Sequence, residues 1–271
     1  LTSLVLERID GVSLAALLST GGALPIDAAI AVALDLALAL AHVHERGLVH
    51  RNVCPASVLV VRGGGVKLAG FGHAAPADVR DGPEPVDARE SLDSPHYMSP
   101  EQILGERVDA RSDVFSLGVV LFEMVAGVRP FEATDERGAA QRIRTEDAPP
   151  LRDARPEAPR ALERIVARCL ATQPNDRYPS AADVADALAT LPGAEHASER
   201  REAIAHVLAR ANVSGMPGDA AALRADAYAT LPPSPSIAPA FFGLVTVALA
   251  IGTGAAVIQH VARDGAPSGT V

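Results

Sequence analysis

The sequence predicts a mainly α-helical domain that contains one small β-hairpin and is followed by a single membrane-spanning helix. Three observations support this prediction. Apolar residues recur at helical spacing in several segments, two runs of β-branched residues flank three consecutive glycines, and one stretch near the C-terminus carries no charge over nineteen residues. The chain has 271 residues, of which 48% are hydrophobic, so it has enough apolar side chains to build a core.

The first predicted elements are a strand and two helices. Residues 4–6 form a short apolar run that ends at a turn, which is typical of a strand. Ser13 is placed to cap a short helix over 14–18 that a pair of glycines ends. The segment 26–45 is rich in Ala and Leu and is apolar on most sides. Because it also contains acidic residues, we expect a buried core helix and not a membrane span.

The middle of the chain contains the hairpin, a loop and three helices. Residues 58–61 and 66–68 flank Gly63–Gly65, which predicts a β-hairpin. Residues 73–93 are rich in Asp, Glu and Pro without an apolar period, so a loop is predicted there. Helical spacing of apolar residues returns over the segments 112–126, 160–172 and 180–191.

The C-terminal part predicts a membrane anchor. Residues 193–239 combine polar, Ala-rich helices with a Pro-rich stretch, as expected of a juxtamembrane linker after a domain over 1–192. Residues 240–258 would span about 28 Å as a helix, close to the thickness of a bilayer core. A buried core helix is the alternative for this stretch. More arginines precede it than follow it, so we expect a single pass through the inner membrane, a cytoplasmic domain and an outer tail over 259–271.

Charge and cysteine content exclude some kinds of function. The formal net charge is −9, and no basic stripe is present, so we expect no nucleic acid partner. Cys54 and Cys169 lie far apart and match no zinc spacing, which indicates free thiols. The clustered His42, His44 and His50 do not share a helix face with a further ligand, so we expect no metal site.

Five ordered segments carry a resemblance to a known family. They are VHRNVCP at 49–55, KLAGFG at 67–72, SPHYMSPEQ at 94–102, RSDVFSLG at 111–118 and PNDRYP at 174–179. In this order and spacing they resemble the second half of a bacterial-type Ser/Thr protein kinase. The resemblance covers residues 4 to about 191 and implies the fold of the kinase C-terminal lobe.

The same resemblance implies that the catalytic positions are degenerate. Asn52 stands where the family has the Asp that accepts the substrate proton, and Cys54 stands where it has a Lys that neutralises the phosphoryl group. Ser57 replaces an Asn that holds magnesium, and Gly70 replaces the Asp that is its principal ligand. Phosphoryl transfer depends on these charges, so we expect no intact catalytic residue and no bound metal.

Four other positions keep the family's structural residues. Glu101 and Arg177 match a buried ion pair that locks the peptide-binding segment to the lobe. The resemblance also implies that Asp113 accepts hydrogen bonds from the backbone at His50, and that His50 supports the segment around Phe71. We therefore expect a lobe that still folds.

Nucleotide binding is expected to be weak or absent. The chain opens at a segment similar to the kinase hinge, so we expect the small lobe, with its Gly-rich phosphate loop and its Lys, to be missing. The positions left to contact an adenine are Leu6, Glu7, Ile9 and Leu59. Without a second lobe or magnesium ligands, neither ATP nor Mg²⁺ should bind with useful affinity. The apolar upper face of the lobe would then favour a protein partner or self-association.

Three functional hypotheses follow. The first is a membrane-anchored pseudokinase that takes part in signalling by binding another protein. The second is a truncated Ser/Thr protein kinase that transfers the γ-phosphate of ATP to protein Ser or Thr when its small lobe is present. The third is a non-functional remnant of an interrupted gene.

Overall fold

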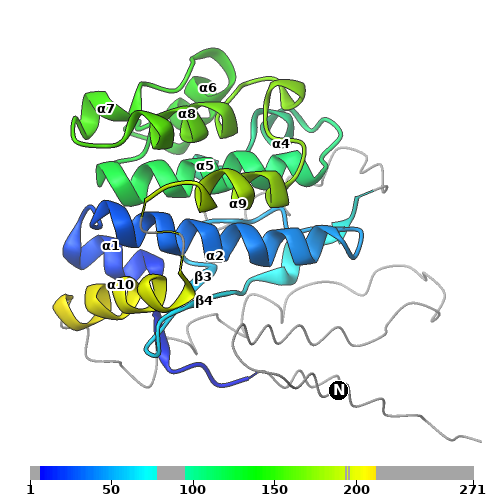
Figure 1. The fold of residues 1–271 in the computed structure, drawn as a ribbon. Coiled ribbons are helices and arrows are strands. Elements are labelled where there is room, and N and C mark those ends of the chain that lie inside the picture. Colours follow the sequence, from blue (N-terminus) through cyan, green and yellow to red (C-terminus); the bar gives the residue numbers. More distant parts are fainter. Residues whose placement is uncertain (1–6, 78–94, 193, 195, 212–271) are drawn as a thin grey trace, which may run out of the picture.

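The computed structural model describes residues 7–77, 95–192, 194 and 196–211. Its helices are α1 (Leu14–Gly21), α2 (Ile26–His44), α4 (Pro100–Leu104), α5 (Ala110–Ala126), α6 (Glu136–Thr145), α7 (Leu151–Ala154), α8 (Arg160–Cys169), α9 (Ala181–Ala189) and α10 (Ala197–Arg210). Three short 3-10 turns are η1 (Phe71–His73), η2 (Pro95–Tyr97) and η3 (Pro174–Asp176). Figure 1 shows these helices as a stack, with α6, α7 and α8 on one side of α5 and with α1 and α10 beyond α2.

Two small antiparallel sheets lie at one side of the stack. The first sheet has the order β1 (Gly11–Ser13), β3 (Val58–Val61) and β4 (Val66–Leu68), with Val60 opposite both Val12 and Val66. The second pairs β2 (Leu48–Val49) with β5 (Ala75–Pro76). The strands β3 and β4 confirm the predicted hairpin. Together the two sheets fix both ends of the loop over residues 50–57, because β2 precedes this loop and β3 follows it.

The helix α2 is the core helix that the sequence predicts. Among the described residues it is the one helix long and apolar enough to cross a membrane, with a mean hydropathy of 1.9, yet 72% of its most apolar window is buried inside the domain. It packs against α5, α9 and α10. Burial of this apolar surface by other helices explains why α2 is part of the core.

The helix α5 is buried along nearly its whole length and contacts α2, α8 and α9. Gly118 permits this close packing: a Cβ atom at this position would lie 2.7 Å from the Cβ of Cys169 on α8. Such a distance is too short for two carbon atoms, so any larger residue would push the two helices apart. Burial raises the pKa of the Cys169 thiol to about 12, and this thiol therefore stays protonated.

Side-chain caps set several helix boundaries. The Ser13 hydroxyl accepts a hydrogen bond from the Ala16 amide and Ser180 accepts one from the Asp183 amide, so α1 and α9 begin directly after these serines. The helix α8 ends at Cys169, three residues before the predicted end. The predicted strand at 4–6, most of the loop at 73–93, the span at 240–258 and the tail lie outside the described residues.

Candidate active site

Loop 50–57 is held by a single buried carboxylate. Asp113, on α5, accepts hydrogen bonds from the backbone amides of His50 and Arg51, both at 2.8 Å. The Nε2 atom of His44, at the end of α2, lies 2.8 Å from the same carboxylate. Arg51 has a φ of 66°, a strained conformation for a residue with a side chain, and within the described ranges no other non-glycine residue has a positive φ. Asp113 thus stabilises an unusual backbone turn.

His50 joins loop 50–57 to the segment that follows β4. Its Nε2 atom donates to the Ala69 carbonyl at 2.8 Å, and its Nδ1 atom accepts from the Asn52 amide at 3.3 Å. Its ring also packs edge-to-face on Phe71, with 4.8 Å between ring centroids. Burial lowers the pKa of His50, although the charge of Asp113 opposes this shift. The ring is therefore neutral, with its proton on Nε2.

The two positions that match magnesium ligands remain neighbours but carry no ligand. Ser57 is buried, and its hydroxyl accepts from the Cys54 amide at 3.1 Å and donates to the Cys54 carbonyl at 2.9 Å. Gly70 has a φ of 81°, and a Cβ atom there would lie 3.2 Å from the Cβ of Ser57. The backbone therefore still brings these positions together, while Gly70 has no side chain and Ser57 bonds within its own loop.

The remaining two degenerate positions do not supply a base or a cation. Asn52 is partly exposed, and its carboxamide has no basicity near neutral pH. Cys54 is only 2% exposed, so its thiol lies within the lobe. A lysine at this position would extend a charged amine toward a phosphate, which a short buried thiol cannot do.

Glu101 and Arg177 form a buried, bidentate ion pair. The Nη1 and Nη2 atoms of Arg177 donate to the two carboxylate oxygens at 2.8 and 2.9 Å, and Ser112 donates to the same carboxylate at 2.5 Å. Arg177 also donates to the carbonyls of Ala171, Thr172 and Arg111. Burial alone would raise the pKa of Glu101, but the hydrogen bonds and charge of Arg177 outweigh burial and lower it. All five N–H donors of Arg177 are used within the fold, and the Glu101 carboxylate accepts three hydrogen bonds.

The segment after η2 is fixed to loop 50–57 by contacts that the sequence analysis missed. The side-chain amide of Gln102 donates to the Arg51 carbonyl at 2.8 Å, and Gln102 also forms a capping box with Ser99 at the start of α4. The Tyr97 hydroxyl donates to Glu123 at 2.6 Å, and burial raises the pKa of both groups. The spacing of Ser99 and Gln102 was a sequence signal for this box. Nothing in the sequence pointed to the contact of His44 with Asp113.

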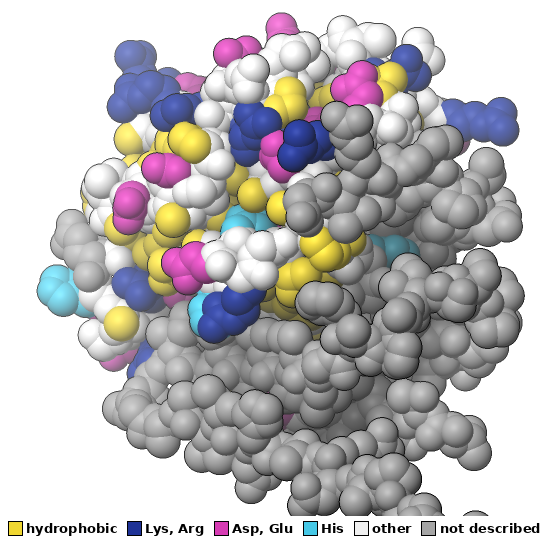
Figure 2. Space-filling view, turned by 90° about the vertical axis from the view of Figure 1, so that its right-hand side faces the viewer, with side chains coloured by type: hydrophobic (Ala, Val, Ile, Leu, Met, Phe, Trp, Pro, Cys, Tyr) yellow, Lys and Arg dark blue, Asp and Glu magenta, His cyan; other side chains and the backbone are white. Residues whose placement is uncertain are grey.

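The positions suggested for adenine contact are only partly described. Leu6 lies outside the described residues. Glu7 binds Lys67 of β4 through both carboxylate oxygens, at 2.5 and 2.6 Å, and the pair is partly exposed. Ile9 and Leu59 are each partly buried, and Leu59 lies opposite Ser13 in the sheet. Figure 2 shows hydrophobic side chains exposed in the central part of one face, below charged side chains.

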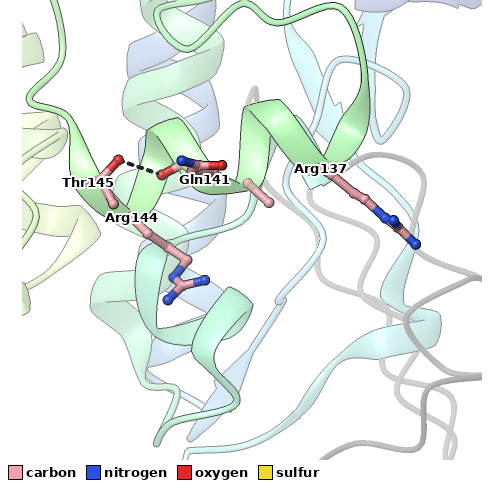
Figure 3. A pocket seen from close by; sticks show the side chains of 5 residues that line it. Arg137, Gln141, Arg144 and Thr145 are labelled. Carbon is pink, nitrogen blue, oxygen red and sulfur yellow. Dashed lines mark hydrogen bonds between the residues drawn. The ribbon is translucent and has the colours of Figure 1, made fainter.

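A separate hollow lies on α6, away from loop 50–57. It is lined by Arg137, Ala140, Gln141, Arg144 and Thr145. Figure 3 shows Arg137 and Arg144 extending from different ends of the helix, with the Thr145 hydroxyl bonded to the Gln141 carbonyl. This hollow contains none of the predicted site residues. In the part of the chain that the structure describes, no group of three or more His, Cys, Asp or Glu residues is arranged to hold a metal ion.

Comparison with known proteins agrees with this geometry. The family model "Protein kinase domain" matches residues 2–188. The serine/threonine-protein kinase PknB of Mycolicibacterium smegmatis is 38% identical over 186 residues, which cover 67% of this chain and 29% of that protein. A probable serine/threonine-protein kinase of Clostridium perfringens is 34% identical over 67% of this chain and 26% of its own length. The kinase PksC of Streptomyces coelicolor is 37% identical over 68% of this chain and 34% of its own length. The chain therefore spans about a third or less of each of these relatives.

Proposed function

Because the chain belongs to the protein kinase family, we propose that its lobe has kept the shape of a Ser/Thr kinase lobe and acts by binding other proteins, without phosphoryl transfer. One observation carries this proposal. The two positions that would hold magnesium lie side by side, yet one is a glycine and the other is a buried serine whose hydroxyl is bonded to its own loop.

Each missing group removes a different part of phosphoryl transfer. Without carboxylate or amide ligands at Ser57 and Gly70, no magnesium ion would neutralise the phosphates of ATP. Without a carboxylate at Asn52, the substrate hydroxyl loses an acceptor worth about 10²–10⁴-fold in rate. Without a lysine at Cys54, the transferring phosphoryl group loses a cation. Because all four positions lie within this lobe, residues elsewhere in a longer chain would not restore these side chains in place.

The intact structural contacts favour a functional role over that of a remnant. A buried ion pair is stable only when both residues are present, because removing one leaves an uncompensated buried charge. The same holds for a buried carboxylate and its hydrogen-bond donors. Glu101, Arg177 and Asp113 all keep their partners. A lobe that is folded in this way and lacks the catalytic groups is suited to binding, either to a protein partner or to a second copy of itself.

We expect ATP to leave the stability of the full chain unchanged. A ligand that binds only the native state at 100 times its Kd adds about 2.7 kcal/mol, which would raise the melting temperature by several degrees. The melting temperature of the purified chain is measured with about 1 mM ATP, both with and without Mg²⁺. This concentration is well above the Kd of a typical nucleotide site. An active kinase measured in parallel serves as the positive control. A clear rise that depends on Mg²⁺ would contradict the proposal.

We further propose that residues 240–258 anchor the lobe to the inner membrane with the lobe in the cytoplasm. The support comes from the sequence alone. The stretch has nineteen residues without a charge, and more arginines precede it than follow it. The full chain should sediment with membranes and resist extraction by high salt, whereas a chain that ends at residue 230 should be released. Salt-extractable full chain would overturn this assignment.

A further inference from the structure

The helix α10 lies beyond the part of the chain that matches the kinase family. The family match ends at residue 188, and α10 spans Ala197–Arg210. Figure 1 shows α10 alongside α2, close to the hairpin of β3 and β4. It contacts α2 and β3.

The apolar contact of α10 is narrow. Ile204 and Val207 are its buried residues, with exposed fractions of 1% and 9%. Ala203, Leu208 and Ala211 pack partly against the core. The side of the helix away from these residues is exposed and polar and carries Glu202, His206 and Arg210. By contrast, most residues of α2 are buried. The hydrophobic stabilisation of α10 is therefore small compared with that of the central helices.

The polar contact of α10 is also incomplete. Arg200 reaches Asp35 of α2, with 3.7 Å between Nε and Oδ1, while its Nη1 atom donates to the Ala194 carbonyl at 2.8 Å. The two side chains are only 15% and 14% exposed. Burial raises the pKa of Asp35, although the charges of Arg200 and Arg201 oppose this shift. Docking of α10 thus leaves a carboxylate poorly solvated and paired only at long range, and release of the helix would return it to water.

The backbone of α10 lies directly on the turn of the β3–β4 hairpin. A Cβ atom at Gly64 would lie 2.4 Å from the carbonyl oxygen of Arg201, and Gly64 has a φ of 75°. A Cβ atom at Gly65 would lie 4.0 Å from a carboxylate oxygen of Asp35. Only glycine at position 64 allows so close an approach. The helix therefore holds this turn against α2, and the same hairpin leads into Ala69 and Gly70.

We propose that α10 is a reversible strap, which in its docked state covers Asp35 and clamps the β3–β4 turn, and which detaches while the rest of the lobe stays folded. Detachment exposes the part of α2 that α10 covers and frees the turn. It also lengthens the connection between the lobe and the segment 212–271. If that segment is the proposed anchor, the strap sets how closely the lobe is held to the membrane. This consequence rests on the proposed anchoring, whereas the strap itself does not.

Hydrogen exchange measured by mass spectrometry on the full chain in detergent micelles tests the strap. In the wild-type protein the amides of α10 should exchange faster than those of α5, because a local opening requires less free energy than global unfolding. In Ile204→Asp, exchange in α10 and in the β3–β4 turn should rise at least about tenfold, while α5 and α8 stay protected within about twofold. Arg200→Ala should also raise exchange in α10 and in the β3–β4 turn, by a smaller factor.

Matched glycine and arginine variants separate the strap from general destabilisation. Gly64→Ala should release α10. Gly47→Ala introduces the same strain at a similar φ of 72°, but its added methyl group meets nothing within 4 Å, so exchange in α10 should stay unchanged. Arg210→Ala, on the exposed side of the helix, should also have no effect. Two results would overturn the proposal: loss of protection across α5 together with α10 in Ile204→Asp, or unchanged exchange in α10 in both Ile204→Asp and Gly64→Ala.

Discussion

Arg177→Met should lower the free energy of unfolding by about 3–5 kcal/mol, because it leaves the buried Glu101 carboxylate without its partner. For a domain of this size, such a loss corresponds to a fall in melting temperature on the order of 10 °C. Methionine fills a similar volume, so the loss reports mainly the unpaired charge and the vacant carbonyls of Ala171 and Thr172. The change is measured by urea unfolding of the full chain in micelles, with the helical circular dichroism signal as the readout.

The control for this variant is Arg142→Met. Arg142 pairs with Glu146 on the surface of α6, where the two side chains are 43% and 48% exposed. Such exposed pairs contribute about 0–1 kcal/mol, so this variant should be nearly neutral. Equal losses in the two variants would show that the buried pair has no special role.

The buried pair also predicts a dependence on pH. The folded pKa of Glu101 lies below its ordinary value of 4.5, so its contribution to stability is present above pH 4.5 and is lost as the pH falls through the folded pKa. Acid should therefore destabilise the wild-type protein more than Glu101→Gln, in which this titration is absent. A variant with the same acid sensitivity as the wild type would show that other carboxylates dominate.

Asp113→Ala should be the second strongly destabilising change. It removes the acceptor for the amides of His50 and Arg51 and the partner of His44, all of which lie against the buried start of α5. Each unsatisfied buried donor costs about 1–3 kcal/mol, so the total loss should be about 3–5 kcal/mol. Exchange of the amides in loop 50–57 should rise as well, because the strained turn at Arg51 loses its support.

Two comparisons sharpen this second prediction. Asp113→Asn keeps one acceptor oxygen and should lose less stability than the alanine variant. Asp109→Ala removes a half-buried cap at the same end of α5, together with its ion pair to Arg111, and should cost about 1 kcal/mol without affecting loop 50–57. If the alanine variants at 109 and 113 had equal effects on that loop, Asp113 would not be its main support.

The central elements of the fold could be predicted because their signals are local. The apolar pattern of α2, the glycines between β3 and β4, and the cap at Ser13 each act within a few residues. The order of motifs then predicted the family, which the match over residues 2–188 shows. The short helices α6 and α7 and the pairing of β2 with β5 were not predicted, since they depend on contacts between distant segments.

The candidate site was predicted in part for the same reason. The resemblance to the kinase motifs led us to expect altered catalytic positions at Asn52, Cys54, Ser57 and Gly70, and this assignment stays a prediction. The resemblance did not show that the Ser57 hydroxyl is bonded to Cys54, or that positions 57 and 70 remain adjacent, because both facts require the folded backbone. The docking of α10 was also missed. A mostly polar helix after a domain has the composition of a linker, and only the folded structure shows that its few apolar residues pack on the lobe.

The most direct test of the central claim is phosphate transfer from γ-labelled ATP by the full chain, to itself and to a generic protein substrate, in the presence of Mg²⁺. We expect transfer by the wild-type chain to equal that of a reaction without protein. We expect the same of Asn52→Asp, because restoring the base restores neither the magnesium ligands nor the missing lysine. Transfer above background by the wild-type chain, removed by chelating Mg²⁺, would contradict the account.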